Sequence, residues 1–182
     1  MRNAIAAALM LLAGPALATG IQIEVEGEAN GTIVIDLLED VAPEHAAQIA
    51  AIAAEGGYDG VVFHRVIEGF MAQTGDVEFG KMGGNMSRAG MGGSTRPNLR
   101  AEFSDIPFDR GVVGMARSQN PDSANSQFFI MFDAAPHLDG QYTIVGHVLE
   151  GMEVVDALTK GEPALNGLVE TPDYIVSATV QE

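Results

Sequence analysis

The 182-residue chain contains no cysteine, and this absence excludes disulfide bonds, cysteine-ligated zinc sites and thiol nucleophiles. Basic side chains are scarce, because 9 Lys and Arg residues stand against 25 Asp and Glu residues, for a formal net charge of −16. A chain this acidic is repelled by nucleic acids and by anionic membrane surfaces, so we expect neither as a main partner.

Familiar catalytic and metal-binding signatures are also missing. The sequence has no G-x-S-x-G motif, no P-loop and no H-E-x-x-H motif, and its four histidines show no metal-ligand spacing. A Cu(I) site is one alternative, because Met82, Met86 and Met91 lie in a Gly-rich stretch and carry the soft thioether ligands that Cu(I) prefers. The ordinary interpretation of these flexible side chains is packing within a loop, and no His or Cys supports the copper site.

The N-terminal segment has the order of a secretory signal peptide. Arg2 is followed by an apolar run from Ala4 to Leu12 and then by the small-residue site Ala16-Leu17-Ala18. An uncleaved anchor is the alternative, but the run is shorter than the ~20 residues that span a bilayer. We therefore expect a signal peptide over residues 1–18, cleavage after Ala18, a periplasmic location and a single domain over residues 19–182.

The pattern of apolar residues favours strands over helices. Alternation from Ile21 to Glu26, then Asn30-Gly31, then a second run to Leu38 predicts an antiparallel hairpin. Further strands are expected at residues 61–67, 111–118, 126–132, 142–148 and 173–182. Two helices are expected, one from Pro43 to Gly56-Gly57 and one over residues 151–161, and the Gly-rich residues 80–97 are expected to form a long loop. Many short strands with two helices predict an all-β fold, either a closed barrel or a sandwich.

Some polar side chains lie within apolar strands, where each requires either a hydrogen-bonding partner or a functional role. Arg65 lies in the run "VVFHRVI", and arginine is almost never fully buried without a partner. Gln73 follows Met71 by two residues and Phe129 follows Gln127 by two, so each pair shares a strand face where the chain is extended. Taken singly, these residues fit an ion pair and two satisfied buried amides. Taken together, they predict a concave site of apolar and amide groups around one cation.

Three long motifs carry a family resemblance. "FHRVIEGFMAQTGD", "GMARS…NSQFFI" and "HLDGQYTIVGHVLEGMEVVD" resemble the cyclophilin family of peptidyl-prolyl cis-trans isomerases in its bacterial secreted form, and the resemblance spans residues 21–182. It implies a closed eight-stranded antiparallel β-barrel capped by two α-helices. It also implies a monomer, without metal or organic cofactor, that isomerises X-Pro bonds in unfolded or exported polypeptides. The alternative is a chaperone that binds proline-containing peptides and turns them over only incidentally.

The resemblance also implies a role for each site residue. Arg65 is the catalytic arginine, and Gln73 and Gln127 bind substrate and position it. The remaining substrate-binding residues are Phe70, Met71, Phe129 and Leu138 around the proline, Ala116 and Arg117 along the peptide backbone, and His137 and Tyr142.

Four positions depart from the better-known eukaryotic pattern. Thr74 replaces a glycine, Arg117 an asparagine, His137 a tryptophan and Tyr142 a histidine. The resemblance implies that the tryptophan replaced by His137 contacts cyclosporin, the cyclic peptide inhibitor of the family. These differences therefore bear on inhibitor affinity and sequence preference, and leave the arginine and the proline pocket in place.

Overall fold

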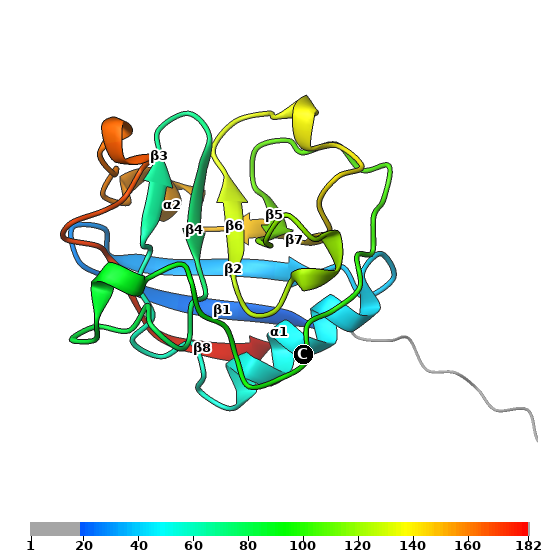
Figure 1. The fold of residues 1–182 in the computed structure, drawn as a ribbon, viewed down its shortest axis with the longest axis horizontal. Coiled ribbons are helices and arrows are strands. Elements are labelled where there is room, and N and C mark those ends of the chain that lie inside the picture. The colour runs from blue at the N-terminus through cyan, green and yellow to red at the C-terminus, as the bar shows by residue number, and fades with distance from the viewer. Residues whose placement is uncertain (1–18, 182) are drawn as a thin grey trace, which may run out of the picture.

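The computed structural model describes residues 19–181, and the signal peptide predicted over residues 1–18 lies outside the described residues. Eight strands form one sheet in the order β3-β4-β6-β5-β7-β2-β1-β8, and every neighbouring pair is antiparallel (Figure 1). The strands are β1 (Gly20–Glu26), β2 (Gly31–Leu37), β3 (Arg65–Ile67), β4 (Met71–Thr74), β5 (Val112–Met115), β6 (Phe128–Met131), β7 (Ile144–Glu150) and β8 (Tyr174–Gln181). The helices are α1 (Pro43–Ala54) and α2 (Met152–Ala157), with four short 3₁₀ helices, η1 (Met86–Arg88), η2 (Pro121–Ser123), η3 (Pro136–Leu138) and η4 (Pro163–Leu165). Within this part of the chain, no helix has the length and apolar character needed to cross a membrane.

The predicted hairpin is confirmed. β1 pairs with β2, and the alternation buries Ile21, Ile23 and Val25 in the core. Gly31 pairs with Val25, so the Asn30-Gly31 dipeptide ends the connection instead of forming its centre. The period of two therefore predicted both the strands and the face that each buries.

Both predicted helices are present, and α2 is shorter than expected. α1 packs against β1 and β8 at one end of the sheet, where it buries Ala46, Ile49 and Ile52 (Figure 1). α2 ends at Ala157, not near Gly161. The reason is a tertiary contact, because the Thr159 N–H donates to the Asp173 carboxylate at 2.7 Å instead of to a helical carbonyl.

The closed barrel is a correction to the sequence analysis, because the sheet is open between β3 and β8. β3 has only three residues, although a strand over residues 61–67 was expected, and its outer edge is taken by the segment 161–169. The Val66 N–H donates to the Gly167 carbonyl at 2.8 Å, and the Gly161 N–H donates to the Val66 carbonyl at 2.9 Å. One isolated bridge, Val62 with Tyr174, links the two ends of the sheet, so the architecture is a half-open barrel.

The strands beneath the predicted site are apolar on both faces because each face belongs to a different apolar cluster. Val66, Ala72 and Ile130 point into the main core between the sheet and the helices. Met71 and Phe129 point outward into a second cluster with Phe108, Val112, Met131, Ala135, Leu138 and Ile144. This outer cluster gives the site a rigid apolar floor.

Candidate active site

The register of three neighbouring strands places the predicted polar residues side by side. Arg65 on β3 pairs with Gln73 on β4, and Gln73 pairs with Phe129 on β6. Side chains in one such row share a face of the sheet. The neighbouring row, formed by Val66, Ala72 and Ile130, points into the main core, so the row with Arg65 points to the outer face. The sheet therefore holds a cation, an amide and an aromatic ring along one line.

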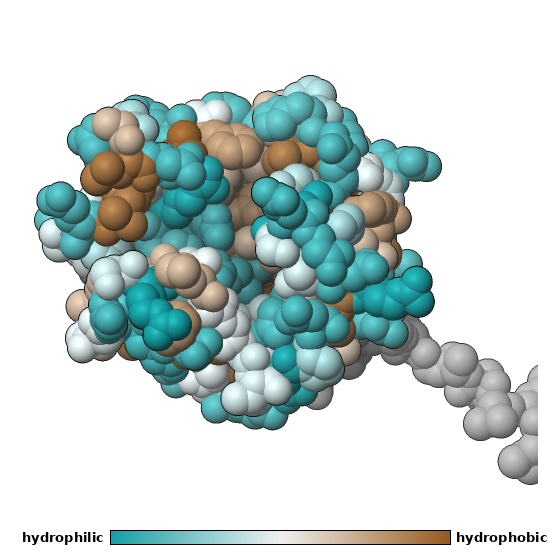
Figure 2. Space-filling model, viewed as in Figure 1, coloured by the Kyte–Doolittle hydropathy of each residue, from teal (hydrophilic) through white to brown (hydrophobic). Residues whose placement is uncertain are grey.

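A hollow of about 350 Å³ opens over this row. Its lining is formed by Arg65, Phe70, Met71, Gln73, Ala116, Arg117, Phe129, His137, Leu138 and Tyr142. All ten of these residues were predicted as site residues from the sequence. In Figure 2, apolar surface is exposed inside a hollow that hydrophilic residues surround. The site is thus a depression with an apolar wall, and the two arginines Arg65 and Arg117 belong to its lining.

Arg65 is held by neutral acceptors, which answers why an arginine stands in this strand. Its Nη1 donates to Gln73 Oε1 at 3.2 Å, its Nε to the Asn166 carbonyl at 3.0 Å and its Nη2 to Asn166 Oδ1 at 3.1 Å. Within residues 19–181, no carboxylate forms an ion pair with this guanidinium. Partial burial lowers the pKa of Arg65, while the nearby Tyr142 acts to raise this pKa. The charge is therefore oriented but uncompensated, so it is free to act on a bound molecule.

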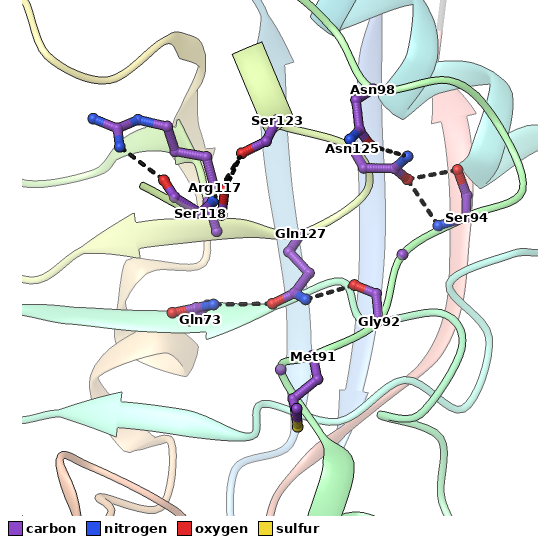
Figure 3. Close-up of a pocket in the computed structure, with 13 residues that line it drawn as sticks. Gln73, Met91, Gly92, Ser94, Asn98, Arg117, Ser118, Ser123, Asn125 and Gln127 are labelled. Carbon is purple, nitrogen blue, oxygen red and sulfur yellow. Dashed lines mark hydrogen bonds between the residues drawn. The ribbon is translucent and has the colours of Figure 1, made fainter. Parts of the chain in front are cut away.

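A chain of amides extends from the arginine. Gln73 Nε2 donates to Gln127 Oε1 at 2.9 Å, and Gln127 Nε2 donates to the Gly92 carbonyl at 2.7 Å (Figure 3). Each amide therefore accepts on one side and donates on the other, which fixes its orientation. Gln127 is the one predicted site residue that does not line the apolar hollow, because it lies one step further along this chain.

A larger hollow of about 570 Å³ adjoins the first and has a mostly polar lining (Figure 3). The two hollows share Gln73, Ala116 and Arg117. The rest of the larger lining is Gly90, Met91, Gly92, Gly93, Ser94, Asn98, Ser118, Ser123, Asn125 and Gln127. A polypeptide that enters one hollow can therefore extend into the other.

The predicted Gly-rich loop forms one wall of the larger hollow and is fastened by a buried carboxylate. Asp76 Oδ1 accepts the N–H groups of Glu78 and Phe79, and Oδ2 accepts those of Gly90 and Gly92, all between 2.7 and 3.1 Å. Burial acts to raise the pKa of Asp76, but these four N–H groups together lower the pKa below its usual value. The ionised Asp76 thus ties the residues just before the loop to Gly90 and Gly92 within it.

Two of the three methionines of this loop are largely exposed, although packing within the loop was expected for them. Met82 is 53% and Met91 74% exposed. Within residues 19–181, no group of three or more His, Cys, Asp or Glu side chains is placed to hold a metal ion. Met91 instead lines the larger hollow.

The residues that depart from the eukaryotic pattern have specific contacts. The guanidinium of Arg117 lies 4.2 Å from the ring centroid of Tyr142, and it donates to the carbonyls of Ser118 and Gln141. The exposed His137 ring lies beside Phe70, with 5.7 Å between centroids. Thr74 is fully buried, and its hydroxyl donates to the Val62 carbonyl at 2.9 Å.

One residue that contacts the arginine, Asn166, was not predicted from the sequence. It stands 101 residues after Arg65, in the segment that covers the edge of β3. The Asn166-Gly167 dipeptide is a turn signal, so a turn was predictable there. Nothing in the local pattern indicates that the turn reaches Arg65.

Comparison with known proteins gives consistent matches. The family described as "Cyclophilin type peptidyl-prolyl cis-trans isomerase/CLD" matches residues 21–180. A "Probable peptidyl-prolyl cis-trans isomerase" from Brucella suis is 59% identical over 154 residues, covering 84% of this chain and 79% of that protein. "Peptidyl-prolyl cis-trans isomerase-like 3" from Gallus gallus is 40% identical over 134 residues, covering 71% of this chain and 77% of that protein.

Solved structures show the same fold. Cyclophilin AquaCyp293 from Hirschia baltica superimposes with a TM-score of 0.71 at 28% identity, covering 88% of this chain and 73% of that chain. A cyclophilin-type isomerase from Cryptosporidium parvum, crystallised in the presence of the dipeptide Ala-Pro, gives a TM-score of 0.74 over 90% of this chain and 99% of that chain. At 24% identity, the second likeness concerns the fold alone.

Proposed function

This chain belongs to the cyclophilin family of peptidyl-prolyl cis-trans isomerases, and from that premise we propose that Arg65 and the apolar hollow beside it isomerise X-Pro bonds. The protein is an isomerase, and its family favours this activity over a chaperone that only binds proline-containing peptides. The observation that carries the assignment of the site is the uncompensated charge of Arg65 at the edge of an apolar depression.

The reaction needs no covalent chemistry. An X-Pro amide resists rotation because its nitrogen shares a lone pair with the carbonyl, and the barrier is ~18–20 kcal/mol. In the twisted transition state the lone pair returns to the nitrogen, which becomes pyramidal and basic. A hydrogen-bond donor near that nitrogen stabilises the twisted state over both planar states, so the donor accelerates isomerisation in both directions.

Arg65 has the properties of such a donor. The guanidinium stays protonated and presents its N–H groups in a rigid, planar arrangement. Its contacts with Gln73 and Asn166 hold it in place before substrate arrives, so little reorganisation is needed at the transition state. Lowering the barrier by ~7 kcal/mol would accelerate rotation about 10⁵-fold.

The apolar wall holds the proline ring while the rest of the amide turns. Phe70, Met71, Phe129 and Leu138 line the hollow, and Phe129 stacks on Phe108 with 5.9 Å between ring centroids. A proline fixed against this wall leaves the preceding carbonyl free to rotate. The adjoining polar hollow then receives neighbouring residues of the same polypeptide, since both hollows share Gln73, Ala116 and Arg117.

An isomerase assay on an X-Pro peptide, by protease coupling or NMR exchange, tests this assignment. Arg65→Ala should keep the fold, because its side chain lies in a surface hollow, and should lower kcat/KM by about 10²- to 10³-fold. Peptide binding should persist, because the apolar wall is intact. Near-normal turnover by Arg65→Ala would overturn the assignment.

We further propose that the protein acts in the periplasm as the bacterial secreted form, on exported and unfolded polypeptides that contain proline. The signal-peptide order of residues 1–18 supports this location. Mass spectrometry of protein from the cell envelope should find an N-terminus at Thr19. A full-length mass would contradict export with cleavage.

We also propose that the protein acts as a monomer, as the resemblance to its family implies. Light scattering of the purified protein tests this directly. A dimer that persists on dilution would contradict the proposal.

A further inference from the structure

The segment 161–169 is held against the free edge of β3 by main-chain hydrogen bonds. In addition to the two bonds that Val66 makes, the Val169 N–H donates to the His64 carbonyl at 3.1 Å, and Leu168 bridges to Arg65. This docking requires glycine at Gly167, because a Cβ there would lie 2.4 Å from Ile67 Cγ1. The segment is therefore held in a fixed position beside Arg65.

Asn166 lies at the tip of this segment in an unusual backbone conformation. Its φ of 56° and ψ of 37° are left-handed, and it is the one non-glycine residue with positive φ in the described part of the chain. It follows η4, whose N-terminus is capped by the Glu162 side chain. A left-handed non-glycine residue costs conformational energy and persists where the surrounding structure enforces it, often at a functional site.

This conformation turns two acceptors of one residue toward Arg65. The Asn166 carbonyl accepts from Nε, and Asn166 Oδ1 accepts from Nη2. With the Gln73 contact, three of the five guanidinium N–H groups have oxygen acceptors. One N–H on each terminal nitrogen remains, and the one on Nη1 lies toward the Met71 sulfur at 3.8 Å. The arginine is thus oriented and still has donors for a substrate.

We propose that Asn166 is a positioning residue for Arg65, which holds the guanidinium through two neutral oxygens and leaves its charge for the substrate. The inference rests on the proposed function of Arg65. A neutral amide is essential to it, because a carboxylate at the same place would form an ion pair and compensate the cation. Asn166 also suits the backbone, since asparagine adopts the left-handed region more readily than other non-glycine residues.

The test is a double-mutant cycle in the full chain. Asn166→Gly keeps the left-handed backbone and its carbonyl but removes Oδ1, so it should lower kcat/KM about tenfold, mainly through kcat. In an Arg65→Ala background the same change should have no further effect, because Asn166 acts through the arginine. Asn166→Asp keeps the acceptor but adds charge, and should lower kcat/KM at least as much as Asn166→Gly. Asn30→Gly, at an exposed asparagine that lines neither hollow, is the matched control and should keep wild-type turnover.

A spectroscopic measurement separates positioning from general destabilisation. The NMR signals of the Arg65 side-chain N–H groups should show faster rotation of the terminal nitrogens in Asn166→Gly than in the wild type or Asn30→Gly. Wild-type kcat/KM in Asn166→Gly, an equal loss in both backgrounds, or wild-type turnover by Asn166→Asp would overturn this inference. If any of these results is found while Arg65→Ala has low activity, only the role of Asn166 is refuted and the proposed function of Arg65 is still supported. Normal turnover by Arg65→Ala would refute the proposed function itself.

Discussion

Replacing His64 should remove much of the acid sensitivity of this protein. The ring is 3% exposed, and among the residues that the structure describes neither of its nitrogens has a hydrogen-bond partner. Burial lowers the pKa of His64 from 6.5 to about 4, although the carboxylate of Asp76 acts to raise it, and Arg65 acts to lower it further. The imidazole is therefore neutral in the folded protein under conditions where it is protonated in the unfolded chain.

The sign and size of the effect follow from proton linkage. The unfolded chain binds the proton more tightly, so this contribution to stability is fully present above pH 6.5 and is lost as the pH falls to about 4. A difference of one pKa unit corresponds to about 1.4 kcal/mol, so the shift of His64 predicts a loss of about 3 kcal/mol. The depressed pKa of Asp76 produces its own loss at lower pH, below the usual range of aspartate.

Urea unfolding of wild-type and His64→Leu protein between neutral pH and pH about 4 measures this contribution. The free energy of unfolding of the wild type should fall by about 3 kcal/mol more than that of His64→Leu across this window. Thr74→Val is the matched control, because it removes the nearby buried hydroxyl bond without removing a titratable group. Its curve should be lower than the wild-type curve but parallel to it. Parallel curves for His64→Leu and wild type, or an NMR titration of His64 near its usual pKa, would refute the reasoning.

Three further predictions concern activity, folding and inhibition. Arg65→Lys should turn over X-Pro peptides about 10²-fold more slowly than wild type in the isomerase assay, because a point charge cannot reproduce the planar fork; wild-type turnover would refute this. Glu102→Ala should lower the free energy of urea unfolding by about 1–2 kcal/mol, because the Glu102 carboxylate accepts from the Glu44 and His45 N–H groups at the start of α1, where Ala42 offers no side-chain cap. Glu102→Gln should recover most of this lost stability. Equal stability of wild type and both variants would contradict the capping role. Cyclosporin should inhibit the wild type weakly, because His137 buries less apolar area than a tryptophan would. His137→Trp should tighten inhibition with little change in turnover. Tight inhibition of the wild type in the same titration would show that position 137 does not set the inhibitor affinity.

Local patterns predicted elements whose cause is itself local. Alternation of Ile21, Ile23 and Val25 required a strand with one buried face, and Pro43 at the first turn predicted the start of α1. The ends of elements were less predictable, because they depend on partners elsewhere. α2 stops at Ala157 because the Asp173 carboxylate takes the Thr159 N–H, and β3 is short because a remote segment occupies its edge.

The residues of the candidate site were predictable from the sequence, but the contacts that hold them in place were not. The sequence showed Arg65, Gln73 and Gln127 as unusual polar residues on apolar strands, and the family resemblance named the ten residues that line the apolar hollow. The open edge of the barrel was not predictable, because an isolated bridge and a full strand ladder leave the same local pattern.

The sequence by itself determined which groups can do the chemistry. It places Arg65 within an apolar strand and puts Gln73 and Gln127 each two residues from an apolar side chain on the same strand face, and it contains no cysteine or metal-binding motif. Only the tertiary structure decided how the arginine is held. Its partner Asn166 lies 101 residues away and reaches it through a left-handed backbone conformation at the tip of a segment docked on β3. Periodicity reports which face a residue occupies, whereas a hydrogen bond depends on the position of two atoms to within a fraction of an ångström, which only the packed chain sets.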